Sequence, residues 1–164
     1  AKRQNMSNAV LFNHFHSKNE LILSILQYYT QYDSAMIQTI ESKKMGAKEA
    51  IKFIVETQVT YYENYPAITA IMQATDGLLA NAELSNNVKD ILHKRDIYLR
   101  ELIEDAQARL EISSDVNSEM VSDIIFGSLN TICMKWRIEG YCFSLKVRAI
   151  KTINTILEKF LPNT

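Results

Sequence analysis

The chain contains 164 residues, of which 47% are hydrophobic and 23% are charged, and its net charge at pH 7 is −1. This composition is that of an ordinary soluble globular protein, and the length allows one well-buried domain or a small head with a larger body. Only four glycines and two prolines are present. Such low numbers favour long helices with few turns and therefore predict an all-α fold.

Several classes of protein are excluded at this level. The two cysteines, Cys133 and Cys142, are too few for a disulfide framework and lack the spacing of a zinc site. Reduced thiols are then the default, which predicts a cytoplasmic protein. No apolar run reaches the roughly 18–20 residues of a membrane span, so we expect no membrane partner.

The charge is unevenly distributed along the chain. Residues 1–18 contain Lys2, Arg3 and Lys18 and no acidic residue, a net charge of +3, while the other 146 residues contain fifteen basic and nineteen acidic residues, a net charge of −4. This asymmetry favours a DNA-facing end and a neutral to acidic body. The alternative is a chance fluctuation in a short window.

The N-terminal stretch has the pattern of a short helix between two turns. Ser7 is a good N-cap, and Leu11 and Phe15 fall at i and i+4 on one face. Ser17 and Glu20 have the spacing of a capping box, which predicts that a second, longer helix starts at about Lys18. The opposite face of the short helix carries Asn8, Ala9, Phe12 and Asn13.

Residues 1–21, A-K-R-Q-N-M-S-N-A-V-L-F-N-H-F-H-S-K-N-E-L, resemble the signature of TetR/AcrR-type transcriptional regulators, A-K-x-A-G-V-S-K-G-T-L-Y-x-H-F-x-S-K-E-E-L. Spacing, caps and the aromatic-x-His-Phe core coincide. Asn5 replaces a glycine, and asparagine tolerates a positive φ better than most residues. Phe12 replaces a tyrosine and Asn8 a lysine, so two polar contacts with the DNA backbone are missing.

In that family the matched residues span the end of the second helix, the recognition helix and the start of the fourth helix. The resemblance therefore implies that the first helix and most of the second precede Ala1. Because a helix-turn-helix needs those helices to hold the recognition helix in the groove, we expect the 164 residues alone to bind DNA poorly.

Helical periodicity and breakers predict the elements that follow. The helix from Lys18 is expected to end at Gly46, and a short helix is expected to end at Asp76-Gly77, whereas residues 78–82 are ambiguous. In chain order, the predicted helices after the head cover residues 18–44, 47–64, 67–75, 84–110 and 118–139, and a final helix opens at Phe143 or Ser144 and reaches Phe160.

The last two helices differ from the others. Residues 118–139 are apolar around nearly the whole circumference, so this helix must be buried on every side. Gly127 in its middle suggests that something approaches the backbone closely. Phe126-Gly-Ser-Leu, Trp136-Arg-Ile-Glu-Gly140 and Phe143-Ser-Leu145 resemble a C-terminal run of many TetR-type proteins, whose last two helices form a four-helix dimer interface. The expected interface residues are Gly127, Leu129, Trp136, Leu145, Ile150, Ile153 and Leu157.

The resemblance also implies which residues contact operator DNA. Asn8 and Asn13 have amides suited to base edges or phosphates, and Ala9 suits a thymine methyl group. Ser7, His14 and Lys18 are candidates for phosphate contacts, and Lys18 lies at a helix N-terminus. Phe12 occupies the family's tyrosine position. The alternative is that Ser7 and Ser17 serve only as caps and His14 is an ordinary surface residue.

A small-molecule site within the body is the second functional expectation. Gln58 and Asn130 are polar groups on apolar stretches and need partners if buried. The alternative for each candidate is ordinary core packing, and Trp136 is a lesser candidate for ligand stacking. A small, largely apolar effector is expected, with candidate contacts from Gln58, Tyr61, Tyr62, Met72, Thr75, Phe126, Asn130, Cys133 and Met134.

Catalysis has little support in the sequence. A di-iron bundle needs paired Glu-x-x-His motifs, and Asp90-Ile-Leu-His93 is only a near match. His14 and His16 point to different faces of a helix and make no metal pair. There is no glycine-rich phosphate loop or nucleophile elbow, so we expect no enzyme, metal or cofactor.

These observations predict an all-α protein with a partial helix-turn-helix DNA-binding domain at residues 1–20 and a ligand-binding and dimerisation domain at residues 21–164. The expected protein is a homodimeric regulator, a repressor that leaves its operator when it binds a small apolar ligand. The alternative is a helical small-molecule-binding module that binds no operator.

Overall fold

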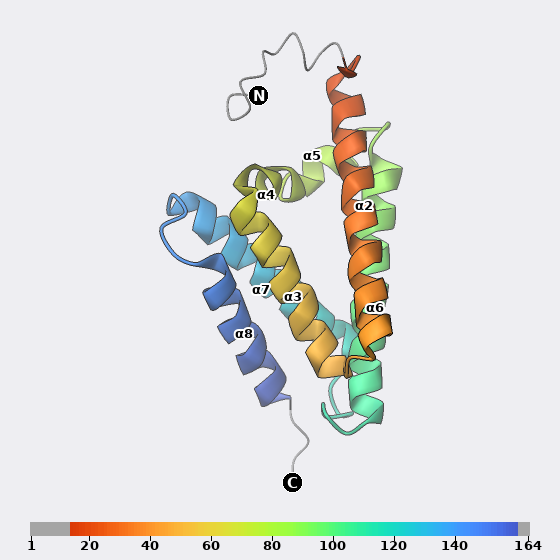
Figure 1. The fold of residues 1–164 in the computed structure, drawn as a ribbon, viewed down its shortest axis with the longest axis vertical. Helices are drawn as coiled ribbons and strands as arrows, with labels where there is room; N and C mark the ends of the chain where they lie inside the picture. Colours follow the sequence, from red (N-terminus) through yellow and green to blue (C-terminus); the bar gives the residue numbers. More distant parts are fainter. Residues whose placement is uncertain (1–13, 161–164) are drawn as a thin grey trace.

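A computed structural model describes residues 14–160, and in this range the chain is helical without any β-strand (Figure 1). The all-α prediction is confirmed. The helices are α2 (Lys18–Lys43), α3 (Ala47–Asn64), α4 (Pro66–Met72), α5 (Thr75–Leu79), α6 (Ser85–Ala108), α7 (Ser118–Ile138) and α8 (Leu145–Lys159).

The N-terminus of α2 has the capping residues that the sequence predicted. Ser17 Oγ accepts a hydrogen bond from the Glu20 N–H at 3.1 Å, which satisfies one of the unpaired donors of the first turn. The Glu20 carboxylate accepts a hydrogen bond in return, from the His16 N–H at 2.5 Å. The second bond therefore reaches the residue before the cap rather than the cap itself.

The C-terminus of α2 differs from the prediction. Lys44, with φ of 50°, adopts the left-handed conformation that ends the helix, and its N–H donates to Glu41 O. Gly46 instead has extended backbone and serves as the N-cap of α3. The turn is therefore made by a lysine, and the glycine was wrongly expected to make it.

The prediction for residues 67–82 was wrong in one respect. Helix α4 ends at Met72, and a second short helix, α5, runs through Asp76 and Gly77 instead of stopping there. Asp76 lies in the first turn of α5, where a carboxylate favours the helix dipole. Leu78 of α5 is buried, and this packing stabilises the helical turn. Tertiary packing therefore outweighs the low helix propensity of Gly77.

The three C-terminal helices agree closely with their predicted bounds. Asn117 and Ser144 cap α7 and α8, accepting hydrogen bonds from the N–H groups of Met120 and Val147. At the end of α7, Gly140 has a φ of 64°, a conformation that glycine adopts without strain.

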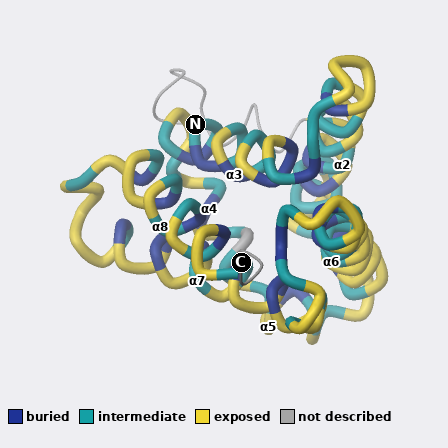
Figure 2. Tube along the Cα trace, turned by 90° about the horizontal axis from the view of Figure 1, so that it is seen from below, coloured by how far each residue is buried: buried dark blue, intermediate teal, exposed yellow. Residues whose placement is uncertain are grey.

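The helices form two groups (Figure 1). Helices α2 and α6 lie side by side, and α3, α7 and α8 pack together beside them, with α4 and α5 above. Seen from below, each long helix carries both buried and exposed residues (Figure 2). Within the described residues, none of the helices is both long enough and apolar enough to cross a membrane.

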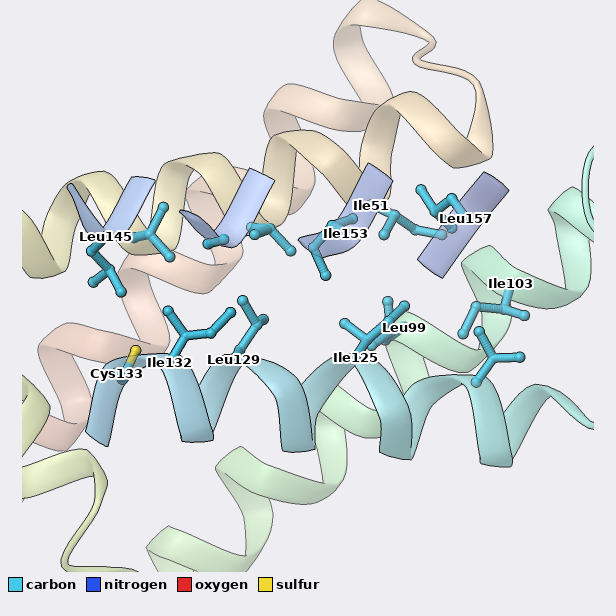
Figure 3. Packing of buried hydrophobic residues seen from close by; sticks show 14 of the residues in the cluster. Ile51, Leu99, Ile103, Ile125, Leu129, Ile132, Cys133, Leu145, Ile153 and Leu157 are labelled. Atoms are coloured by element: carbon cyan, nitrogen blue, oxygen red, sulfur yellow. The ribbon is translucent and has the colours of Figure 1, made fainter. Parts of the chain in front are cut away.

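Two apolar cores hold these groups together. The main core joins α3, α6, α7 and α8, and Figure 3 shows α8 side chains such as Leu145 and Ile153 directed towards Ile132 and Ile125 of α7. The small core joins the N-terminal half of α2 to α5 and α6, and its buried residues are Leu26, Leu78, Leu84, Val88 and Ile91.

Replacement of a main-core residue tests this packing. Ile103 of α6 is fully buried, whereas Ile97 on the same helix is 45% exposed. We expect Ile103→Ala to lower the free energy of unfolding by about 2–5 kcal/mol, because the lost methyl groups leave a cavity. Urea denaturation followed by circular dichroism measures this, and Ile97→Ala should change it by less than about 1 kcal/mol.

Candidate functional site

A cavity of about 310 Å³ lies between α2, α3, α6 and α7. Its volume is at the lower end of the range for small-molecule sites, roughly 300–1,000 Å³. The apolar residues that line it come from all four helices: Leu26, Met36, Ile37, Ile54, Val55, Ile91, Leu99, Ile125, Phe126 and Leu129. The polar and charged lining residues are Gln27, Thr30, Asp33, Ser34, Gln58, Asn87, Asp90, Lys94, Arg95 and Tyr98.

A largely buried ion pair lies in the wall of this cavity. Arg95 Nε and Nη2 of α6 donate to the two carboxylate oxygens of Asp33 of α2 at 2.7 and 2.9 Å. Only 15% of the Arg95 side chain and 18% of the Asp33 side chain are exposed. Burial alone would lower the pKa of Arg95, but the hydrogen bonds and charge of Asp33 outweigh it and raise that pKa above its usual value.

A tyrosine pair extends this polar site into the core. The Arg95 guanidinium lies 4.3 Å from the centre of the Tyr29 ring, in the range of a cation–π interaction. The Tyr29 hydroxyl donates to the Tyr62 hydroxyl at 2.6 Å, and Gln58 Nε2 donates to the same oxygen at 2.9 Å. Burial raises the pKa of both tyrosines. Both hydroxyls are therefore neutral, and the network links α2, α3 and α6.

The residues predicted for ligand contact are only partly brought together. Gln58 and Phe126 line the cavity, and Tyr62 lies behind Gln58. Tyr61 packs against the rings of Tyr32 and Tyr65 instead. Met72 ends α4, and Thr75 begins α5 outside the lining.

The α7 candidates have other places. Asn130 and Met134 are exposed, and Cys133 lies in the main core, where burial raises the pKa of its thiol to about 11. Such a thiol is largely unreactive at neutral pH. Sequence reasoning missed Asp33 and Arg95, although each charge falls on an apolar helical stripe, between Tyr29 and Met36 and between Ile91 and Leu99.

Most of the residues predicted for the dimer interface contribute to the core of the subunit. Their side chains pack within the subunit, because the inner faces of α7 and α8 build the main core. Trp136 also donates from Nε1 to Phe143 O at 2.8 Å. These residues are the buried Leu129, Trp136, Leu145, Ile153 and Leu157 and the partly buried Ile150.

The outer face of α7 carries several exposed apolar side chains among polar ones such as Asp123 and Lys135. Gly127 lies on this face, and apart from its chain neighbours and the backbone of its own helix, no atom of residues 14–160 would come within 4 Å of a Cβ placed there. The close approach expected at Gly127 is therefore absent within the described residues of the subunit. A groove between α7 and α8 passes this glycine and is also lined by Ile124, Thr131 and Arg148. The exposed apolar side chains beside it are Met120, Ile124, Met134 and Ile138 of α7 and Val147 of α8.

The DNA-binding candidates lie at the start of the chain. His14 and Lys18 are exposed, and Lys18 is the first residue of α2. Ser7, Asn8, Ala9, Phe12 and Asn13 lie outside the described residues. Residues 14–160 also contain no group of three or more His, Cys, Asp or Glu side chains that could hold a metal ion.

Solved structures with the same arrangement of helices are transcriptional regulators. The regulator FadR from Bacillus subtilis, solved in complex with stearoyl-CoA, superposes with a TM-score of 0.73 at 18% identity over 100% of this chain and 86% of that chain. The fatty acid degradation regulator FadR from Bacillus halodurans gives 0.72 at 17% identity, over 96% and 84%. At these identities the likeness shows the fold.

Sequence comparisons identify the family. The model of the TetR C-terminal family described as YsiA-like protein, C-terminal region, matches residues 28–159. The chain therefore belongs to the TetR-type transcriptional regulators. Nucleoid occlusion factor SlmA from Vibrio atlanticus (strain LGP32) is 19% identical over 129 residues, which are 79% of this chain and 66% of SlmA; SlmA from Vibrio campbellii (strain ATCC BAA-1116) is 20% identical over the same shares. The chain thus matches 66% of the length of these relatives.

The hydroxyl of Tyr62 provides a test of the network beside the cavity. In Tyr62→Phe the Tyr29 hydroxyl and the Gln58 amide lose their shared acceptor in a buried site, so we expect the free energy of unfolding to fall by about 1–3 kcal/mol. Tyr65→Phe is the matched control, because Tyr65 is exposed, and it should change stability by less than about 0.5 kcal/mol. Equal effects of the two substitutions in a urea titration would contradict the network.

Proposed function

We propose that this protein is a DNA-binding repressor that a small, largely apolar ligand releases from its operator. The observation that carries the proposal is the cavity, because it is walled by apolar side chains and includes α2, the helix that directly follows the DNA-binding candidates. A ligand in this cavity contacts α2 and is thereby able to affect the position of its N-terminal end.

The class of ligand is supported by a structural relative. FadR from Bacillus subtilis has the same fold and was solved in complex with stearoyl-CoA, a molecule with a long alkyl chain. A shared fold does not imply a shared ligand. The apolar side chains that line this cavity are an independent reason to expect an alkyl chain. Burial of such a chain gains about 0.8 kcal/mol for each methylene group.

The contacts near the N-terminus of α2 support a mechanical connection. Asn19 Nδ2 donates to Glu83 at 2.7 Å, and Asn81 Nδ2 donates to Asn19 at 3.1 Å. Together with the small core, these bonds fix the start of α2 to α5 and α6. A ligand that favours one position of α2 over another shifts the population of the two states. In a dimer that shift changes the spacing of two recognition helices, which must match half-sites about 34–36 Å apart.

The proposed dimer forms through the outer faces of α7 and α8. Exposed apolar patches of this kind mark interaction sites, and a two-fold axis would bring the same patch of a second subunit onto it. Gly127 leaves room there for a side chain of the partner. The residues that cover the interface are the exposed ones beside the groove, not those of the main core.

The effect of Lys18 on DNA binding tests the first part of the proposal. The protein is expressed from its complete reading frame, and its affinity for duplexes selected from a random pool is measured by fluorescence anisotropy. We expect Lys18→Ala to weaken binding to all sequences alike and to reduce the slope of log K against log salt by about 1, because one phosphate contact is lost. Lys43→Ala, at the opposite end of α2, should have no effect. An absence of sequence-selective binding would favour a ligand-binding module without an operator.

Gly127 provides a separate test of the dimer. We expect Gly127→Leu to convert the dimer into a monomer in sedimentation velocity, because the new side chain fills the groove that receives the partner. The subunit itself should remain folded, since it has space at this position and leucine favours a helix more than glycine does. Gly77→Leu, where space is also free, is the control. A wild-type protein that is monomeric at micromolar concentration contradicts the proposed interface.

A further inference from the structure

The ion pair of Asp33 and Arg95 differs from the other ion pairs of residues 14–160. The pairs of Arg100, Arg109 and Lys146 are much more exposed, whereas Asp33 and Arg95 are mostly buried and both line the cavity. Desolvation of two charges costs free energy that their attraction often fails to recover, and an apolar pair of similar volume is often as stable. The position of this pair in a ligand cavity suggests a role beyond stability.

Arg95 has hydrogen-bond donors with which it can bind an anion in addition to Asp33 or in its place. A guanidinium has five N–H donors, and Asp33 accepts from only two nitrogens, Nε and Nη2. The ring of Tyr29 holds the guanidinium in place from another side. Arg95 therefore keeps a partner in the wall even when Asp33 moves away.

From this geometry we propose that the cavity selects an alkyl ligand that ends in a carboxylate, and that this carboxylate binds Arg95 in competition with Asp33. The inference rests on the proposed function, because it requires the cavity to bind a ligand. It adds the chemical class of the ligand's polar end and the residue that recognises it. Planar, bidentate pairing favours arginine as the partner of a carboxylate.

The charges around the cavity favour an anion over a cation. A cationic ligand that took Asp33 would leave Arg95, which cannot lose its charge, buried without an anion. A ligand carboxylate leaves Asp33 with water as a partner, because 18% of its side chain is exposed and its neighbour Ser34 is exposed as well. Two further charged residues line the cavity: Lys94 attracts a carboxylate and Asp90 repels it, and both are exposed, so solvent screens them.

The competition gives the ligand a direct effect on α2. Asp33 belongs to α2 and Arg95 to α6, so a ligand that replaces Asp33 removes the ionic connection between these helices. The main and small cores still hold α2 in place, but the ion pair between α2 and α6 is lost. The ligand thus binds more tightly to the state in which α2 has moved, which is the requirement for a population shift.

The test compares two probes of equal chain length, decanoate and decan-1-ol, by isothermal titration calorimetry. We expect wild-type protein to bind decanoate about tenfold or more tightly than decan-1-ol, the ratio expected for a charge-assisted hydrogen bond. Arg95→Gln should lose this preference and still bind decan-1-ol. Arg109→Gln is the control, because it removes an exposed arginine at the C-terminal end of α6. It should leave both affinities unchanged.

Asp33→Asn provides a second, independent reading that also serves if Arg95→Gln fails to fold. Removal of the competing carboxylate should strengthen decanoate binding several-fold and leave decan-1-ol unchanged. If wild-type protein binds neither probe, the proposed function fails. If it binds both equally, or if Asp33→Asn does not strengthen decanoate binding, the cavity remains a ligand site and the present inference is overturned.

Discussion

The packing of α2 against the rest of the protein is the constraint on which the proposed mechanism depends. Leu26 in the small core and Tyr29 in the main core are both buried, and apolar burial of this kind supplies most of the stability. The cavity and the Asp33–Arg95 pair lie beside these contacts. Helix α2 is thus held firmly by apolar residues, while its polar contact with α6 faces a space that a ligand is able to enter.

Helix α7 carries apolar side chains on both its inner and its outer side, and only the inner side packs within the subunit. Its inner side packs against α8, as Figure 3 shows for Ile125, Leu129 and Ile132. Its outer side leaves Met120, Ile124 and other large side chains in contact with water. The subunit alone leaves this part of the apolar surface of α7 exposed, and the proposed dimer would cover it. Because apolar residues lie on both sides of α7, its sequence predicts burial but does not distinguish the residues of the core from those of the proposed interface.

The helices were predictable because their signals are local. Ser17, Asn117 and Ser144 cap helices through hydrogen bonds within four residues, and apolar periodicity is visible within each segment. The cavity was less accessible, because four helices far apart in the chain surround it. Of the predicted ligand residues, Gln58 and Phe126 line it, whereas Tyr61, Asn130, Cys133 and Met134 lie elsewhere. The informative signal was a charge on an apolar stripe, and Asp33 and Arg95 supply this signal with opposite signs on two helices.

Membership of a family determines the fold of a protein more firmly than the identity of its ligand. The FadR structures share the arrangement of helices at only 17–18% identity, so the shared fold does not determine which residues line the cavity of this chain. An apolar wall selects by size and shape and distinguishes one methylene group by only about 1–3 kcal/mol. A buried charge discriminates more strongly, because the wrong ligand leaves it unpaired. Within this cavity, specificity is therefore expected to depend on the polar residues in its wall, and above all on Arg95, whose charged side chain is only 15% exposed.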